Sequence, residues 1–344
     1  MVELQRSRRL FSKHAIWFVL AGYVAVEVLN RIGFLSNYVI QVLTLALINV
    51  MVTVSLNLVN GYTGQFCVGQ AGFMAVGAYV SATLTTLLFH TGTWSPVLQV
   101  VAFFVALLAA AIAAGVVGYL IGAPTLRLKG DYLAIVTLAF GEVVRAFLRS
   151  VKYTGGARGL GGIPGYSSFL WVFLASVTTV IIARNLVFSS YGRAWMGIRE
   201  SEIAAEVMGV DTTRMKITVF TISAAITGFA GGLYAHVLRF LHPDNFSYLK
   251  SMDYLVYLYA GGTASLSGSI VGAISLTIIP EVLRFLSDWR MVLYPFVLII
   301  LMLTRPIGLL GGREFAFLRP AEGYIKRWAE TLRNSINAKT HAAD

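Results

Sequence analysis

The sequence predicts an all-α integral membrane protein, a polytopic helical bundle of about 8–10 transmembrane helices with broken or re-entrant segments and both termini in the cytoplasm. Two observations predict this fold class. Of the 344 residues, 57% are hydrophobic and only 12% are charged, about half the charged share of a typical soluble domain. The chain also contains repeated apolar runs long enough to span a bilayer. A soluble enzyme or soluble binding module is excluded, because so few polar residues could not cover its surface.

The apolar runs define the candidate spans in order along the chain. Each is close to the roughly 20 residues that a spanning helix requires, except the short and interrupted run at 252–266. The spans cover residues 15–30, 38–59, 66–90, 96–121, 131–150, 168–187, 217–238, 252–266, 268–286 and 290–306.

The N-terminus combines a basic start with an apolar stretch, as a signal peptide does. No A-x-A-like cleavage site follows the stretch, so we interpret it as a retained first helix. The expected organisation is a basic cytoplasmic N-terminus at 1–14, a transmembrane domain at 15–312 and a polar cytoplasmic tail at 313–344.

Basic residues predict the orientation. The 27 Lys+Arg exceed the 16 Asp+Glu and give a net charge of +11. With the N-terminus inside and the spans alternating, about two thirds of the basic residues fall in cytoplasmic segments, as the positive-inside rule requires. This excess is typical of loops that face anionic lipid, and we prefer that reading to nucleic-acid binding.

Small residues recur at helical spacing and predict close helix packing, because apolar surface gives no driving force between helices in lipid. The packing can lie within the chain or at a seam between two subunits. These faces are formed by Ala110, Ala114, Gly118 and Gly122, by Ala224, Gly228 and Gly232, and by Gly268 and Gly272.

Two glycine-rich segments interrupt the apolar pattern: GYTGQFCVGQAGFMAVGAY at 61–79 and GGTASLSGSIVGA at 261–273. Non-helical backbone at membrane depth is tolerated only where protein or a water-filled cavity satisfies it, and paired interruptions point to a substrate path. The alternative is that each segment is a tight loop at the membrane surface. The path residues we predict are Gly61, Gly64, Gln65, Gly69, Gln70, Gly72, Glu142, Gly261 and Gly262.

Glu142–Arg145 and Glu281–Arg284 are both Glu-x-x-Arg pairs, spaced so that their charges can meet on one helix face. Such pairs neutralise charge near the membrane interface or take part in gating a path. His236, alone below a glycine face, is most simply a hydrogen-bonded core residue.

Catalytic and cofactor motifs are missing from the sequence. The glycine-rich TGGARGLGG at 154–162 lacks the Lys-Ser/Thr pair of a phosphate-binding loop. The sequence has no HExxH or GxSxG motif, and the single Cys67 allows no internal disulfide. We therefore expect no catalytic residues, no metal, no cofactor and no ATPase site in this chain.

One loop, at 189–216, is far more charged than the rest of the body of the chain. Residues 198–208 predict a short helix with Ile203 and Val207 on an apolar face, an Arg199–Glu202 pair, and Gly209 as its C-terminal stop. We favour docking of this helix onto a soluble partner over packing on the chain's own membrane domain. The predicted coupling residues are Arg193, Arg199, Glu200, Glu202, Ile203, Glu206 and Val207.

Several blocks resemble a known family, the M-type permease subunits of branched-chain amino-acid ABC importers. The blocks are NLVNGYTGQFCVGQAGFMAVGAY, GDYLAIVTLAFGEVVR, TGG, GRAWMGIRESEIA, FTISAAITGFAGGLYA and RPIGLL, spread over roughly residues 40–312. Two positions depart from the family pattern: Phe66-Cys67-Val68 stands where LSL is commoner, and Tyr259-Ala260-Gly261-Gly262 where LGG is usual.

The resemblance implies a bacterial inner-membrane permease that pairs with a homologous H-type permease, two cytoplasmic ATPase subunits and a periplasmic binding protein. The 198–208 helix would then insert into a cleft of an ATPase. The cargo would be branched-chain or related neutral amino acids, with urea, amides or small organic acids as alternatives within the family. From a different class, an ion-coupled secondary transporter could use Glu142 or Glu281 as an ion site.

Overall fold

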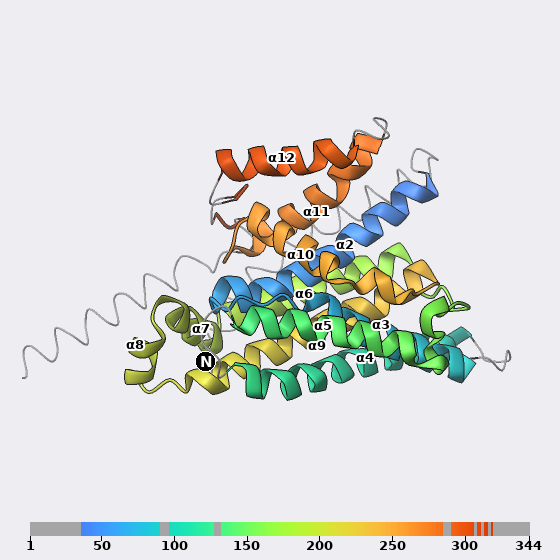
Figure 1. Ribbon diagram of the computed structural model, residues 1–344, viewed down its shortest axis with the longest axis horizontal. Helices are drawn as coiled ribbons and strands as arrows, with labels where there is room; N and C mark the ends of the chain where they lie inside the picture. The colour runs from blue at the N-terminus through green and yellow to red at the C-terminus, as the bar shows by residue number, and fades with distance from the viewer. Residues whose placement is uncertain are drawn as a thin grey trace, which may run out of the picture. The chain divides into compact units, whose positions relative to one another are not determined.

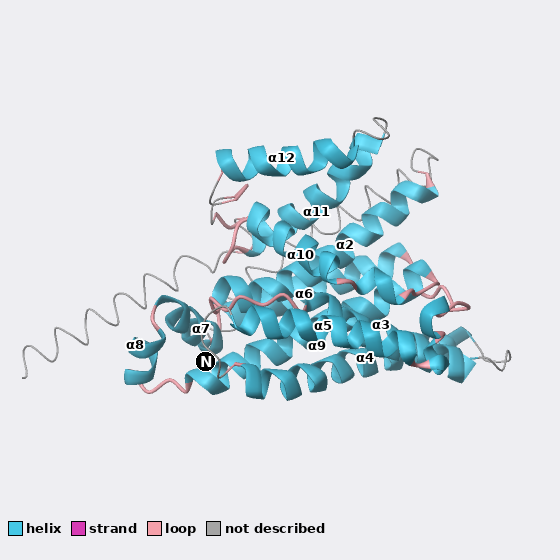
Figure 2. Ribbon diagram, in the orientation of Figure 1, coloured by secondary structure: helices cyan, strands magenta, loops and turns pink. Residues whose placement is uncertain are grey.

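The computed structural model describes residues 36–89, 96–126, 132–284, 290–305, 308–310, 313–315 and 318. The predicted N-terminus at 1–14, the span at 15–30 and most of the tail at 313–344 lie outside these ranges. The chain forms two units, and all the helices described here belong to the unit Leu35–Arg313. The regular structure of the described residues is helical, with one isolated bridge between Leu160 and Leu241. The all-α class is confirmed (Figures 1 and 2).

The helices follow the predicted spans closely. Asn37–Tyr62, Val97–Thr125, Phe169–Val187 and Thr212–Leu238 are long and apolar enough to cross a membrane, and Leu266–Val282 is a shorter apolar helix. The helices are α2 (Asn37–Asn57), α3 (Gln70–Phe89), α4 (Pro96–Thr125), α5 (Tyr132–Ser150), α6 (Phe169–Val187), α7 (Ser190–Glu200), α8 (Glu202–Val207), α9 (Thr212–Leu238), α10 (Tyr248–Gly261), α11 (Leu266–Val282) and α12 (Arg290–Thr304). Short helical turns lie between them: η1 (Leu58–Tyr62), η2 (Lys152–Thr154), η3 (Gly156–Arg158) and η4 (Pro243–Phe246).

Helix α9 is the packing centre of this unit and lies against α2, α3 and α4. Its glycines make the approach possible. Gly77 of α3 lies directly on Gly228, so that a Cβ on Gly77 would overlap the Gly228 carbonyl. On the other side of α9, a Cβ on Gly228 would meet Ala114 and the Ala110 carbonyl of α4. The small-residue packing predicted for α4 and α9 is therefore confirmed within the chain.

A buried polar network fixes the rotation of these helices. The amide of Gln70 donates to Ser223 Oγ (3.0 Å) and accepts from Thr227 Oγ1 (2.7 Å). Ser223 Oγ also donates to the Ser55 carbonyl of α2 (2.8 Å). Hydrogen bonds among buried groups avoid the penalty of unsatisfied polar atoms in an apolar interior. His236 is likewise a core residue, bonded to Ser81 Oγ (3.1 Å) and the Pro164 carbonyl (2.8 Å).

We expect Gly77→Leu to separate α3 from α9 and lower the melting temperature of the detergent-solubilised protein. Overpacking a fitted interface costs about 1–3 kcal/mol and sometimes more. The matched control is Gly197→Ala on α7, where an added Cβ meets no atom within 4 Å. That change removes a helix-interior glycine and should leave the melting temperature unchanged or raise it. Equal melting temperatures for Gly77→Leu and wild type would contradict the packing described.

Candidate translocation path and docking loop

The first glycine-rich segment breaks the helix, as predicted. Helix α2 passes into a π turn, η1, and residues 63–69 are non-helical until α3 begins. Side chains satisfy this backbone. The Asn60 amide bonds both the N–H (3.2 Å) and the carbonyl (3.3 Å) of Cys67, and Val68 N–H donates to Thr137 Oγ1 of α5 (3.1 Å). This is the condition under which a membrane domain tolerates irregular backbone.

Helix α3 begins in the middle of the bundle. Its first residue, Gln70, bonds Ser223 and Thr227, which lie 11 and 15 residues beyond the start of α9, or roughly 17–23 Å along it. Gly64, by contrast, packs against Arg199 near the C-terminus of α7. Residues 63–69 therefore run from the α7 end of the bundle back into its interior, so this segment of the chain is re-entrant.

The second glycine-rich segment breaks between α10 and α11, at residues 262–265. The side chain of Asn57 joins the two breaks. Its amide donates to the Ser265 carbonyl (2.9 Å) and to Ser269 Oγ (2.8 Å), and its oxygen accepts from Ala264 N–H (3.0 Å). Asn57 is not among the residues predicted from the sequence, although an amide near the end of an apolar helix is a usable signal.

The predicted path glycines differ in what they touch. A Cβ on Gly69 would come within 2.9 Å of the Thr137 carbonyl, and one on Gly72 within 2.9 Å of Gly141 Cα, so both hold α3 against α5. Gly261 packs on Gly268 and Gly272 of α11. Gly64 is exposed and has a φ of +74°, which favours glycine. The other predicted path residues in these two segments are buried or half-buried: Gly61, Gln65, Gln70 and Gly262.

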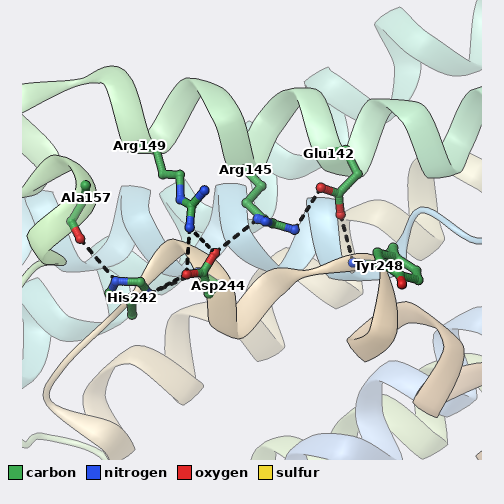
Figure 3. A network of polar contacts seen from close by, with 7 residues as sticks. All are labelled: Glu142, Arg145, Arg149, Ala157, His242, Asp244 and Tyr248. Carbon is green, nitrogen blue, oxygen red and sulfur yellow. Dashed lines mark hydrogen bonds and ion pairs between the residues drawn. The ribbon is translucent and has the colours of Figure 1, made fainter.

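Glu142 belongs to a charged network between α5 and the chain around η4 (Figure 3). The predicted Glu142–Arg145 pair forms, with Arg145 Nη1 at 2.8 Å. The second carboxylate oxygen accepts from Tyr248 N–H (2.9 Å), the first residue of α10. Both oxygens are thus engaged, and neither contacts the glycine-rich segments. In the second Glu-x-x-Arg pair, Glu281 bonds the Tyr38 hydroxyl and Arg284 lies over the Tyr38 ring.

Asp244 is the other acidic centre of this network. Arg149 Nη2 contacts both its oxygens at 2.8 Å, and Arg145 Nε lies 3.2 Å from Oδ1. Desolvation acts to raise the pKa of the carboxyl, but the hydrogen bonds and charge of Arg149, with the charge of Arg145, hold the pKa below its ordinary value of 3.8. His242 Nδ1 accepts from Asp244 N–H, so Nε2 carries the proton and donates to the Ala157 carbonyl (3.1 Å).

The charged loop departs from the predicted single helix at 198–208. Ser201 is extended (φ −162°, ψ 112°) and separates α7 from α8. Its hydroxyl accepts from Ala204 N–H (3.2 Å) and caps α8, the role that serine favours over a helix interior. The stop at Gly209 is confirmed by its φ of +83° and by paired bonds from Gly209 and Val210 N–H to the last turn.

The break at Ser201 also changes the ion pairs, and the predicted Arg199–Glu202 pair is wrong. Glu202 binds the nearly buried Lys216 at 2.6 Å, while Arg199 Nη1 donates to the Gly61 carbonyl (3.1 Å) at the first helix break. Arg199 Nε lies 4.0 Å from Glu200. Among the other predicted coupling residues, Glu206 accepts from Thr212 Oγ1 (2.8 Å), and Arg193 donates to Ser190 Oγ (3.1 Å).

An apolar surface projects from α8. Ile203 is 75% exposed, and Val207 and Met208 are each 82% exposed. Large apolar side chains this exposed on a short helix are typical of a protein interaction site. Within the described residues, no group of histidine, cysteine and acidic side chains could hold a metal ion.

Comparison with known proteins identifies close relatives. The family model for the permease component of branched-chain amino acid transport systems matches residues 38–304. The chain is 33% identical to the high-affinity branched-chain amino acid transport system permease protein LivM of Escherichia coli K12, over 80% of this chain and 70% of that protein. It is 25% identical to permease protein LivH of the same strain, over 77% of this chain and 91% of that protein. The chain is also 27% identical to the L-arabinose ABC transporter permease protein AraH of Azospirillum brasilense, over 65% of this chain and 66% of that protein. No solved structure matches the chain.

The depressed pKa of Asp244 makes a prediction about pH. Its ionised form stabilises the fold at any pH above the ordinary value of 3.8, and that contribution is lost as the pH falls through the lower folded value. Asp244→Asn should lower the melting temperature at neutral pH, because Arg145 and Arg149 lose their shared counterion. The deficit relative to wild type should stay constant down to about pH 4 and shrink below it.

Thermal unfolding of the purified proteins across this pH range measures the deficit. Glu200→Gln removes a carboxylate whose side chain is 80% exposed and should show no comparable deficit at any pH. A deficit in Asp244→Asn that remained unchanged in acid would contradict the ion-pair account.

Proposed function

The chain belongs to the branched-chain amino acid transport permease family, and from this premise we propose that it forms half of the translocation path of an ATP-driven importer. The cargo is a branched-chain or related neutral amino acid, delivered by a periplasmic binding protein. The other half of the path comes from a homologous permease of the kind represented by LivH. The complex lies in the bacterial inner membrane, with this chain as a multi-pass subunit.

The observation that carries this proposal is the contact between the docking loop and the helix break. Arg199, at the end of α7, donates to the Gly61 carbonyl and packs on Gly64. A soluble partner that moves α7 would therefore move the non-helical segment directly. The sequence contains no phosphate-binding loop, so the energy for active transport comes from another chain or from an ion gradient. We assign α7 and α8 to docking on cytoplasmic ATPase subunits.

The path itself is assigned to the two glycine-rich segments that Asn57 holds together. Their predicted members are Gly61, Gly64, Gln65, Gly69, Gln70, Gly72, Gly261 and Gly262. Gly69 and Gly72 contribute by bringing α3 close to α5, and Gly64 by exposing backbone at the re-entrant turn. Glu142 contributes by capping α10, the helix that leads to the second break.

The proposal is tested by transport in proteoliposomes that contain this chain with its partner permease, ATPase subunits and binding protein. Leucine uptake should require ATP and continue when an ionophore abolishes the ion gradients. An ion-coupled secondary transporter would give the opposite result. Urea, short amides and L-arabinose, offered with the same complex, test the alternative cargoes.

Docking through α8 gives a second prediction. Ile203→Glu with Val207→Glu should abolish retention of the ATPase subunits in a pull-down and abolish ATP-dependent uptake, while insertion in the membrane stays normal. Both side chains are largely exposed, and such surface changes usually alter stability by no more than about 0.5 kcal/mol. Two buried carboxylates at an apolar contact are far more costly.

The control is Tyr153→Glu, which introduces a single negative charge at a side chain that is 96% exposed on η2. It should retain the ATPase subunits fully. Reversing Glu202 is a poorer test, because it would leave nearly buried Lys216 beside a second cation. Normal ATPase retention in the Ile203/Val207 variant would show that this face is not the docking surface.

A further inference from the structure

Two aromatic side chains meet at the exposed edge of the helix breaks. Phe66 lies in the non-helical segment, and Tyr259 lies near the C-terminus of α10. Their ring centroids are 6.5 Å apart, within the range of favourable aromatic pairs. Phe66 is 42% exposed and Tyr259 is 40% exposed. Each comes from one of the two segments in which this sequence departs from the family pattern.

The surface that Phe66 exposes is not suited to lipid. It belongs to residues 63–69, which form no helix, and irregular backbone is stable at membrane depth only against protein or water. The face that Phe66 exposes is therefore covered by protein or water and not by lipid acyl chains.

The pair also lies within reach of the docking loop. Gly64, two residues before Phe66, packs on Arg199. Gly61, whose carbonyl accepts from Arg199, packs against the backbone of Ala264 in the second break. A displacement of α7 would thus act on both sides of the aromatic pair, through residues 61–64 toward Phe66 and through the 262–265 turn toward Tyr259.

We propose that Phe66 and Tyr259 form a gate at the docking-loop end of the translocation path. The two rings close the path when α7 is at rest and give an apolar surface to the side chain of an amino acid that passes when the loop moves. This inference rests on the proposed function, since it requires that α7 and α8 receive an ATPase partner. Beyond that function, the gate names the side chains that obstruct the solute and the contacts that link the obstruction to the docking loop.

The test uses the complete importer in proteoliposomes. Two quantities are measured: the leak of preloaded leucine without ATP, and the leucine imported per ATP hydrolysed. Phe66→Ala and Tyr259→Ala should each increase the leak roughly two- to tenfold, the population change expected from losing one aromatic contact. The yield per ATP should fall correspondingly. The double variant should leak little more than either single variant, because the two rings act as one contact.

The control is Phe104→Ala on α4. Phe104 has the same 42% exposure as Phe66 and also pairs with an aromatic ring, that of Trp171 at 5.0 Å. It lies away from the breaks, on a helix that packs against α3 and α9, and its removal should change neither quantity. Where an alanine variant fails to assemble, Phe66→Leu and Tyr259→Leu are compared with Phe104→Leu. The Phe66 and Tyr259 variants are again expected to leak more leucine than the Phe104 variant.

The outcomes separate the two proposals. Wild-type complex that imports no leucine with ATP overturns the proposed function. Wild-type complex that imports normally, with Phe66 and Tyr259 variants that leak no more than the Phe104 variant, overturns the gate and leaves the importer intact. A greater leak in the Phe66 and Tyr259 variants with unchanged ATPase activity supports the gate.

Discussion

The structure depends on one constraint, that a polypeptide in a bilayer must satisfy its own backbone. Two helices of this chain break, and asparagine side chains form hydrogen bonds with the backbone at both breaks. Asn60 bonds both polar groups of Cys67, and Asn57 ties the first break to the second. An unsatisfied buried donor or acceptor costs roughly 1–3 kcal/mol. Losing the Asn57 amide would leave Ala264 N–H at the second break without its acceptor, and Asn57 directly precedes the first break, so the two breaks are coupled in energy as well as in position.

Close packing is the second requirement, and it follows from the first. The polar side chains that support the breaks can reach their partners only if the helices are close enough. Glycine provides this closeness where α3 crosses α9 and α5. The result places Gln70 within hydrogen-bond distance of Ser223 and Thr227. In a bundle spaced by larger side chains, the start of α3 would leave its polar groups unpaired in the interior of the bundle.

Hydropathy was sufficient to predict the membrane-domain helices among the described residues, because lipid imposes length and composition on every span. It was also sufficient to locate both breaks, where glycine and polar residues interrupt an apolar run. It could not predict the partners of single side chains. Ser201 ends a helix that the apolar pattern would continue, because its hydroxyl caps α8. Glu202 then turns to Lys216, 14 residues away, instead of to Arg199. Asn57 was missed for the same reason, since its partners around Ser265 lie in a segment that the fold alone brings to it.

The buried and exposed parts of the breaks have different freedom to vary. Asn57, Gln70 and the packed glycines are held by several contacts each, and a change at any of them disturbs helix positions. Phe66 and Tyr259 are partly exposed and pair with one another, and changes at exposed positions usually cost no more than about 0.5 kcal/mol. These two positions can therefore be altered while the supporting network stays fixed. If they form the proposed gate, the solute meets residues that the fold does not require, and one architecture can serve solutes of different chemistry.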